Sequence, residues 1–334
     1  MSRKDIEEKD YFNDVLHFAD TCNGILFQGE CNILPEDLEE SDTELIYTDK
    51  KLAKVVRIDG MRYWKKQGVN IALLGLEYQS LTDYHMVFRN MMAESMAYYK
   101  QWKMNKRKYS KEYLKWFGRL FKLRNSTEFL SGMIKEDRFI PVILIVVNLS
   151  PEKWDGATSL HEMLKLPDSL KRYVNNYKLN IFDYHEHDDF SVFKTEVRVI
   201  FEALKAAKEE SCMKKVFSVY EKVELATARL IETVLNITFD RKYIVKDEEG
   251  RECMEMCKAW DDHWKSGQRD GIAIGMEKGM EKGIEKGIAV FIQDKIADGV
   301  EEERIVSKLV FFYQLSNEDA KEYVRKFSEG NSTH

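Results

Sequence analysis

The stretch NIALLGLEYQ, residues 70–79, is the strongest indication of the fold. It is apolar, it is bounded by turn residues, and it ends in Glu77, Tyr78 and Gln79, a pattern typical of a buried strand with a polar tip. A second apolar run, IPVILIVVNL at 140–149, is rich in β-branched residues and predicts another buried strand. Residues 85–102, between the two runs, have helix-forming composition. Strand, helix and strand in this order predict an α/β protein.

Further elements are predicted on both sides of this unit. Residues 11–27 carry apolar side chains at helical spacing and predict an amphipathic helix, whereas residues 43–47 and 53–58 predict strands. Residues 103–136 are basic and predicted to be largely helical. The pattern over 190–265 predicts helices, with a short β excursion near 238–245.

The composition indicates the environment of the chain. The longest strongly apolar run, 140–149, is about half of the roughly 20 residues that a membrane-spanning helix needs. Residues 1–12 are charged and no apolar stretch follows them, which is not the pattern of a signal peptide. Five cysteines in 334 residues do not make a disulfide framework. We therefore expect a soluble, cytoplasmic protein that makes no membrane contact.

The distribution of charge bears on nucleic-acid binding. The net charge of −6 opposes contact with phosphates, which requires a positive surface. Residues 100–122, KQWKMNKRKYSKEYLKWFGRLFK, are nevertheless strongly basic, with interleaved aromatic residues. This segment predicts either a DNA-binding patch or the solvated face of an amphipathic helix. The candidate DNA contacts are Lys103, Lys106 and Arg107, together with Arg89 in the preceding helical segment.

Glycine recurs at every fourth position between residues 267 and 287, at Gly267, Gly271, Gly275, Gly279, Gly283 and Gly287. Each glycine inside a helix costs about 0.8–1.0 kcal/mol relative to alanine. The row of glycines moves around the helix axis by about 40° per repeat, because four residues exceed one helical turn of 3.6 residues. Glutamate and lysine fill the gaps, which excludes a membrane packing motif. We expect a flexible or weakly associating helical arm, through which a homo-oligomer could form, followed by short helices over 290–327.

Glu77 and Gln79 are the candidate catalytic residues. A carboxylate at the tip of a buried strand is costly unless it meets a cation or hydrogen-bond donors. Hard divalent ions such as Mg²⁺ prefer carboxylate oxygens. Metal-assisted phosphodiester hydrolysis needs converging acids beside a group that orients the attacking water. Glu77 would supply an acid, and Gln79, on the same face of the strand, would align the water. A surface glutamate after a strand gives the same E-x-Q pattern.

Over residues 11–205 the sequence resembles the recombination-promoting nuclease (Rpn) family, which also includes transposase-like proteins. The order and spacing of several short pieces carry the resemblance: HFADTCNGILFQG (17–29), PEDLEESDTELI (35–46), IALLGLEYQS (71–80), VFRNMMAESMAYYKQW (87–102), FLSGMIKEDRFIPVI (129–143), WDGATSLHEML (154–164) and NNYKLNIF (175–182). The glycine repeat also looks like tails of that family.

The resemblance implies a restriction-endonuclease-like core of the PD-(D/E)XK type, a mixed sheet flanked by helices, within residues 1–205. A helical segment over 206–265 and a helical C-terminal extension over 266–334 would follow this core. The resemblance also implies DNA as substrate and Mg²⁺ or Mn²⁺ as cofactor. By position, Asp20 matches the family's acid on a helix, and Glu77 and Gln79 match its E-x-Q motif.

The sequence departs from the family on the strand that should carry a metal-binding aspartate. Residues 52–58 read LAKVVRI, with Lys54 near the expected position, and a cation there would oppose metal binding. Asp42, Asp49 and Asp59 are the alternative metal ligands, depending on the register. Two hypotheses follow: a metal-dependent DNA endonuclease, or a catalytically degenerate nuclease fold that binds DNA or protein. An aspartate close enough to Glu77 to share one ion would favour the endonuclease.

Overall fold

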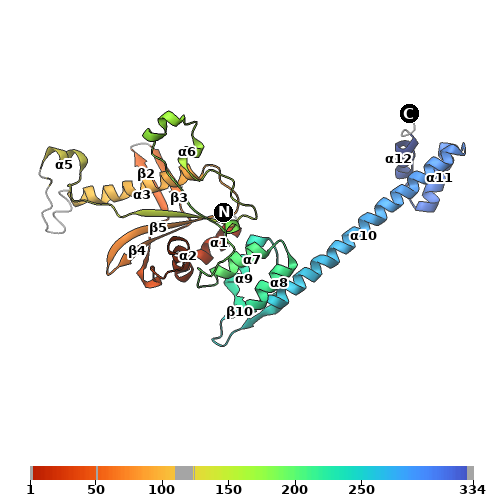
Figure 1. Ribbon diagram of the computed structural model, residues 1–334. Helices are drawn as coiled ribbons and strands as arrows, with labels where there is room; N and C mark the ends of the chain where they lie inside the picture. Colours follow the sequence, from red (N-terminus) through yellow and green to blue (C-terminus); the bar gives the residue numbers. More distant parts are fainter. Residues whose placement is uncertain (1–2, 50–51, 110–122, 124, 329–334) are drawn as a thin grey trace. The chain divides into compact units, whose positions relative to one another are not determined.

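A computed structural model describes residues 3–49, 52–109, 123 and 125–328 of the chain (Figure 1). The chain divides into two compact units, Met1–Asp261 and Asp262–His334. The first unit contains a mixed sheet flanked by helices, and the second is helical, which confirms the predicted α/β class with a helical C-terminal extension. Within the described ranges, every helix is too short or too polar to cross a membrane.

The central sheet has five strands in the order β1-β4-β5-β6-β7. NIALLGLEYQ lies in the central strand, β5 (Val69–Gln79), which is antiparallel to β4 (Gly60–Lys66) and parallel to β6 (Val142–Asn148). The edges are β1 (Leu38–Glu40), antiparallel to β4, and β7 (Asn180–Asp183), parallel to β6. A parallel pair needs a crossover connection, and the first part of it is helix α3 (Met86–Lys108).

The two faces of β5 are covered by different helices, because successive side chains of a strand point to opposite faces. Leu73 packs in an apolar cluster with Ala93 and Met96 of α3. Tyr78 stacks on Phe12 of helix α1 (Arg3–Asn13), with the ring centroids 4.4 Å apart. Figure 1 shows α3 running along the sheet and α1 near the end of β5. The polar end of β5 therefore lies between the start of α3 and the end of α1.

The helix predicted over 11–27 is two helices, so that boundary was wrong. Helix α2 (Val15–Phe27) begins after Asp14, whose carboxylate accepts hydrogen bonds from the backbone N–H groups of Leu16 and His17. Aspartate is a favoured N-cap because its side chain satisfies these otherwise unpaired donors. The apolar spacing continues across the break, which is why periodicity alone joined the two helices. The helical turns before Tyr11 were not predicted.

The strands predicted at 43–47 and 53–58 are confirmed, but they form a separate hairpin. Strands β2 (Glu44–Asp49) and β3 (Leu52–Arg57) pair with each other, and Leu45 and Val56 pack in the same cluster as α3. Helix α3 extends into the basic segment, where α5 (Ser126–Ser131) is also helical. Residues 110–122 and 124 of that segment lie outside the described residues.

The remaining elements of the first unit follow in chain order. The 3-10 helices are η1 (Pro35–Asp37), η2 (Asp168–Tyr173), η3 (Tyr184–Glu186) and η4 (Arg241–Tyr243). The helices are α6 (Leu160–Met163), α7 (Val197–Ala206), α8 (Glu210–Val219) and α9 (Leu225–Leu235). A small antiparallel sheet has the order β8-β10-β9 and contains β8 (Lys222–Glu224), β9 (Ile244–Lys246) and β10 (Glu252–Glu255). Helices α7 and α9 pack on each other, and α9 packs on α1, so residues 206–261 belong to the same unit as the central sheet.

The glycine repeat lies within one helix, α10 (Met256–Ala297). Its C-terminal end packs against α11 (Glu302–Tyr313) and α12 (Asn317–Ser328) through an apolar cluster that includes Ile288, Ile305 and Val324. The predicted helical arm and the short helices after it are therefore confirmed. A Cβ atom added at any glycine from Gly267 to Gly283 would meet no atom of the described chain within 4 Å apart from its own stretch of helix. Association through this arm stays a prediction.

Candidate functional site

Glu77 lies near the end of β5 and is completely buried. Its Oε2 lies 2.7 Å from a guanidinium nitrogen of Arg89, in the first turns of α3. The same guanidinium contacts Asp83 at 3.3 Å, just before α3. The described part of the chain supplies no hydrogen-bond donor to the buried Oε1 of Glu77. Glu77 is therefore a half-satisfied carboxylate that faces the start of α3.

Asp59 lies next to Glu77, in the turn between β3 and β4. Its Oδ2 accepts a hydrogen bond of 3.0 Å from the backbone N–H of Tyr78, the residue that follows Glu77. Its Oδ1 lies 2.8 Å from Nζ of Lys9 on α1. In the sheet register Gly60 pairs with Leu76, so antiparallel pairing places Asp59 opposite Glu77. Of the three alternative aspartates, Asp59 is the one that this fold brings to Glu77.

The two carboxylates influence each other. Burial, together with the nearby Asp59 carboxylate, raises the pKa of Glu77 to about 8, and Arg89 opposes this shift. A buried carboxylate disfavours its charged form, and a second negative charge adds to that cost. A pair of this kind is a common arrangement at functional sites. The cations that accompany the pair are Arg89 and Lys9.

A cavity of about 340 Å³ opens at this end of β5. Glu8 and Lys9 of α1 line it on one side, and Asp59 and Arg89 line it as well. Gln79 also lines the cavity, at the last position of β5, together with Tyr78, Ser80 and Leu81. Glu8 accepts a hydrogen bond of 2.9 Å from the hydroxyl of Ser80, which ties α1 to the chain beyond β5. The cavity therefore collects Glu8, Gln79 and Ser80 beside Asp59, whereas the fully buried Glu77 is not among its lining residues.

Asp20, matched by resemblance to the helix acid, does not line this cavity and instead binds the turn before α7. Its two carboxylate oxygens accept hydrogen bonds of 2.8 and 2.9 Å from the backbone N–H of Lys194. Oδ2 also accepts hydrogen bonds from the backbone N–H of Thr195 at 2.8 Å and from its hydroxyl at 2.7 Å. Asp20 therefore holds the turn before α7. Glu8, one turn before Phe12 on α1, is the helix acid that lines the cavity.

Asp42 also makes its contacts far from Glu77. Its carboxylate lies 2.7 Å from Nζ of Lys100 and is largely exposed. Lys100 is eleven residues beyond Arg89 on α3, which places it roughly 16 Å further along the helix axis. Asp42 is thus a surface ion-pair residue. It does not line the cavity of Glu8 and Asp59.

Lys54 and Asp49 lie in the separate hairpin, and not in the central sheet. Lys54 pairs with Tyr47 in the register of β2 and β3, and Asp49 pairs with Leu52 at the closed end. Their side chains lie outside the described part of the structure. The aspartate that reaches β5 comes from the turn after β3, five residues beyond Lys54.

The predicted DNA contacts on α3 divide into two groups. Arg89 lines the cavity and is paired with Glu77. Lys103 and Lys106 lie over the rings of Tyr99 and Trp102, with Nζ 4.8 and 5.0 Å from the ring centroids. Arg107 is exposed in the last turn of the same helix. The second group forms a basic and aromatic surface along the C-terminal half of α3.

Sequence reasoning missed Glu8 and Lys9. Both lie in MSRKDIEEKDYF, which was interpreted only as a charged N-terminus. Glu8 and Phe12 are four residues apart, a spacing that places both side chains on one face of α1 and could have indicated their shared position. Because Phe12 packs on Tyr78, Glu8 is carried to the end of β5.

The described residues contain no group of three or more His, Cys, Asp or Glu side chains already arranged to hold a metal ion. The site therefore consists of the Asp59–Glu77 pair with Glu8, Gln79, Lys9 and Arg89 around it. No family model matches the chain, and comparisons with curated proteins and with solved structures give no significant match.

Proposed function

We propose that this chain is a divalent-metal-dependent DNA endonuclease of the PD-(D/E)XK type, related to recombination-promoting nucleases. The single observation that carries the proposal is the meeting of Asp59 and Glu77 beside a cavity lined by Gln79. Three separate segments supply these groups and Glu8: α1, the turn before β4 and the end of β5. This is the order of acid, aspartate and E-x-Q that the family resemblance implies.

The donor set fits a hard cation. Mg²⁺ and Mn²⁺ prefer carboxylate oxygens and keep several waters, so few protein ligands suffice. Oε1 of Glu77 is buried without a hydrogen-bond donor from the described chain, and a cation would satisfy it. Asp59 and Glu77 would hold the ion, with Glu8 nearby. When bound, the ion would act as a Lewis acid that lowers the pKa of a water and neutralises developing phosphate charge.

The other residues have separable roles. Gln79 is neutral and can both donate and accept hydrogen bonds, which suits the orientation of an attacking water in the cavity. Lys9 and Arg89 provide the positive charge that binds a phosphate, and the arginine fork matches phosphate oxygens in a bidentate manner. Arg89 keeps its second contact, to Asp83, if its contact to Glu77 is exchanged.

The basic surface of α3 extends the site along a DNA strand. Lys103 follows Arg89 by fourteen residues, or roughly 21 Å of helix rise. That length equals about six phosphates of one strand at 3.4 Å each. Lys103, Lys106 and Arg107 would bind the phosphate backbone there, beside the rings of Tyr99 and Trp102. The local positive charge of this surface would offset the net negative charge of the chain, which opposes DNA binding.

The second candidate function is a nuclease fold that binds DNA without cutting it. The specific observation in its favour is that both carboxylates already have cationic partners, Arg89 at 2.7 Å and Lys9 at 2.8 Å. A fixed cation opposes metal binding at its neighbour. Under this alternative the two ion pairs are permanent and hold α1 and α3 onto the end of β5.

Plasmid nicking by the full-length protein with Mg²⁺ or Mn²⁺ tests the proposal. We expect chelator-sensitive cleavage, reduced at least about a hundredfold in Glu77→Gln and in Asp59→Asn because each removes a metal-binding charge. Asp42→Asn is the matched control, since it makes the same change at an exposed ion pair. Cleavage that survives Asp59→Asn would contradict the assignment of this site.

Metal binding has a readout that does not depend on cleavage. Mn²⁺ at a hundred times its Kd would stabilise the fold by about 2.7 kcal/mol, because a ligand specific for the folded state adds its binding free energy to stability. We expect a chelator-reversible rise in melting temperature that Asp59→Asn abolishes and Asp42→Asn leaves intact. DNA binding without this rise and without nicking would establish the second candidate.

A further inference from the structure

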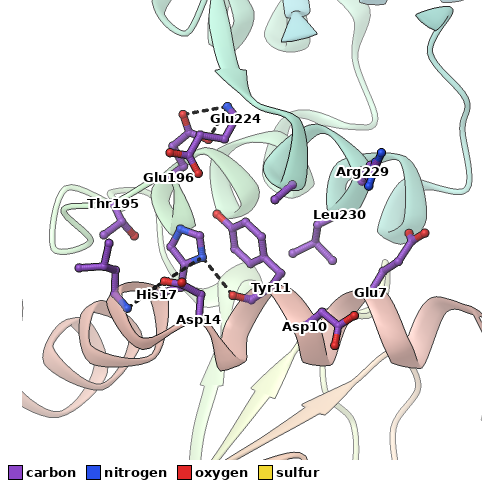
Figure 2. Close-up of a pocket in the computed structure, with 12 residues that line it drawn as sticks. Glu7, Asp10, Tyr11, Asp14, His17, Thr195, Glu196, Glu224, Arg229 and Leu230 are labelled. Atoms are coloured by element: carbon purple, nitrogen blue, oxygen red, sulfur yellow. Dashed lines mark hydrogen bonds and ion pairs between the residues drawn. The ribbon is translucent and has the colours of Figure 1, made fainter. Parts of the chain in front are cut away.

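A second cavity, of about 710 Å³, lies in the first unit between α1, the start of α2 and α9. It is distinct from the candidate nuclease site, because Glu7, Asp10 and Tyr11 of α1 line it whereas Glu8 and Lys9 line the other. Its volume falls within the range of pockets that hold small molecules. Figure 2 shows its lining side chains gathered around the ring of Tyr11.

His17 is the most informative residue of this cavity. Its side chain is 11% exposed, and its ring stacks on Tyr11 with the centroids 4.1 Å apart. Its Nδ1 donates a hydrogen bond of 3.0 Å to the backbone carbonyl of Tyr11. A carbonyl only accepts, so Nδ1 carries a proton. The ring lines the cavity between Asp14 and Glu196 (Figure 2).

The polar groups around His17 are acceptors. Glu196 accepts the backbone N–H of Glu224 at 3.0 and 3.2 Å and lies close enough to His17 to interact electrostatically. The described residues that line the cavity include five carboxylates and one permanent cation, the exposed Arg229. The carboxylates are Glu7, Asp10, Asp14, Glu196 and Glu224. A lining of this kind complements a cationic ligand that is rich in N–H donors.

The acidic groups lie at two ends of the cavity. Figure 2 shows Glu196 and Glu224 on one side and Glu7 and Asp10 on the other, with Tyr11 and Leu230 between them. The ring of Tyr11 is almost fully buried, and its hydroxyl is held by Thr227 at 3.2 Å. An apolar centre between two negative ends matches a flexible alkyl chain with an ammonium group at each end.

We propose that this cavity binds an aliphatic diamine or polyamine, with one ammonium group at the His17–Glu196 end and a second at the Glu7–Asp10 end. The alkyl chain then lies between the two ends, in the part of the cavity that Tyr11 and Leu230 line. An anion is disfavoured by the carboxylates, and a dehydrated metal ion finds no preformed cluster of ligands among the described residues. The site is independent of the proposed nuclease activity.

Calorimetric titration of the full-length protein tests this proposal. The probes are 1,4-diaminobutane and spermidine, with butylamine and 1,4-butanediol as the one-ended and uncharged controls, at constant ionic strength in a chelator. We expect saturable binding of the diamine, about tenfold weaker binding of butylamine and none of the diol, because each charge-assisted hydrogen bond adds about that factor. Equal binding of diamine and butylamine, or binding of the diol, would overturn the two-ended site.

Two isosteric variants remove the acidic end without removing structural hydrogen bonds. Glu196→Gln keeps an oxygen for the N–H of Glu224, and Asp14→Asn keeps a favoured N-cap for α2. We expect each to weaken the diamine about tenfold. Glu248→Gln, in the exposed turn between β9 and β10, is the matched control and should leave binding unchanged. An equal loss of affinity in the control would overturn the proposal. So would the absence of binding by the parent protein up to about 10 mM diamine, a concentration at which even a weak, millimolar affinity would be detected.

Discussion

A guanidinium nitrogen of Arg89 lies 2.7 Å from Oε2 of Glu77, and Glu77 is fully buried while Arg89 remains 29% exposed. The contact joins the end of β5 to the start of α3, and Asp83 holds the guanidinium from its other side. A buried carboxylate with one partly exposed cationic partner has two possible protonation states. It can keep its charge and its partner, or it can take up a proton. The predictions for this site follow from that choice.

Replacing Arg89 with methionine should destabilise the fold by about 1–3 kcal/mol at pH 8, the cost of leaving a buried acceptor without its donor. The loss should stay below the 3–5 kcal/mol of a fully buried ion pair, because Glu77 can take up a proton when Arg89 is removed. Denaturant unfolding of the variant measures it.

Two controls make the interpretation specific. Arg57→Met breaks an exposed pair with Glu44 and should change stability by less than about 0.5 kcal/mol. In Glu77→Gln the same Arg89→Met change should cost less, since no buried charge is left behind. An equal cost in both backgrounds would show that Arg89 acts through packing alone.

The pH dependence of stability should carry the signature of Glu77. Its pKa is raised to about 8 in the folded chain, whereas an unfolded glutamate ionises near pH 4.3. Between these values the folded state binds the additional proton, so stability falls as the pH rises, by at most about 1.4 kcal/mol per pH unit. Melting temperatures at pH 6, 7 and 8 should fall more steeply in the parent than in Glu77→Gln. Parallel curves would contradict the raised pKa.

Asp20 should behave as a structural residue and not as a catalytic one. Asp20→Ala leaves the N–H groups of Lys194 and Thr195 without their acceptor, so we expect a loss of at least about 2 kcal/mol of stability. Asp20→Asn should lose less, because one amide oxygen still accepts. Nicking activity per folded molecule should be unchanged in both. A stably folded but inactive Asp20→Ala variant would return this residue to the catalytic site.

The sequence predicted the centre of the sheet better than the site beside it. NIALLGLEYQ and IPVILIVVNL were predicted as buried strands because a continuous apolar run bounded by turn residues is typical of a strand buried on both faces, and residues 72–78 and 144–148 are buried. Glu77 and Gln79 were found because they lie in that strand. Asp59 stayed one of three alternatives, since its approach to Glu77 depends on the register of β4 with β5. Glu8 was missed because only the stacking of Phe12 on Tyr78 brings α1 to the strand end.

The glycines of α10 give a test of the arm that needs no knowledge of its partner. A Cβ atom at Gly271, Gly275 or Gly279 meets nothing within 4 Å in the described chain, so each Gly→Ala change is free of steric cost there. Alanine is the better helix former by about 0.8–1.0 kcal/mol per site. The triple alanine variant should therefore show an increased helical signal and a higher melting temperature. Gly24→Ala in α2 is the contrast: its Cβ would collide with the Phe193 ring and should destabilise the fold.

The same triple variant separates an arm that acts alone from one that associates. Glycine allows two helix backbones to approach closely, and a methyl group at three successive repeats blocks that approach. If the arm forms a homo-oligomer through the stripe, the parent should be larger than a monomer by light scattering and the triple variant should be monomeric. If both proteins have the same mass while only helicity increases, the stripe makes no close contact between copies. The six glycines lower the stability of the helix by roughly 5 kcal/mol relative to alanine, and in that case no packing offsets this loss. A functional requirement for a weak helix would then explain them.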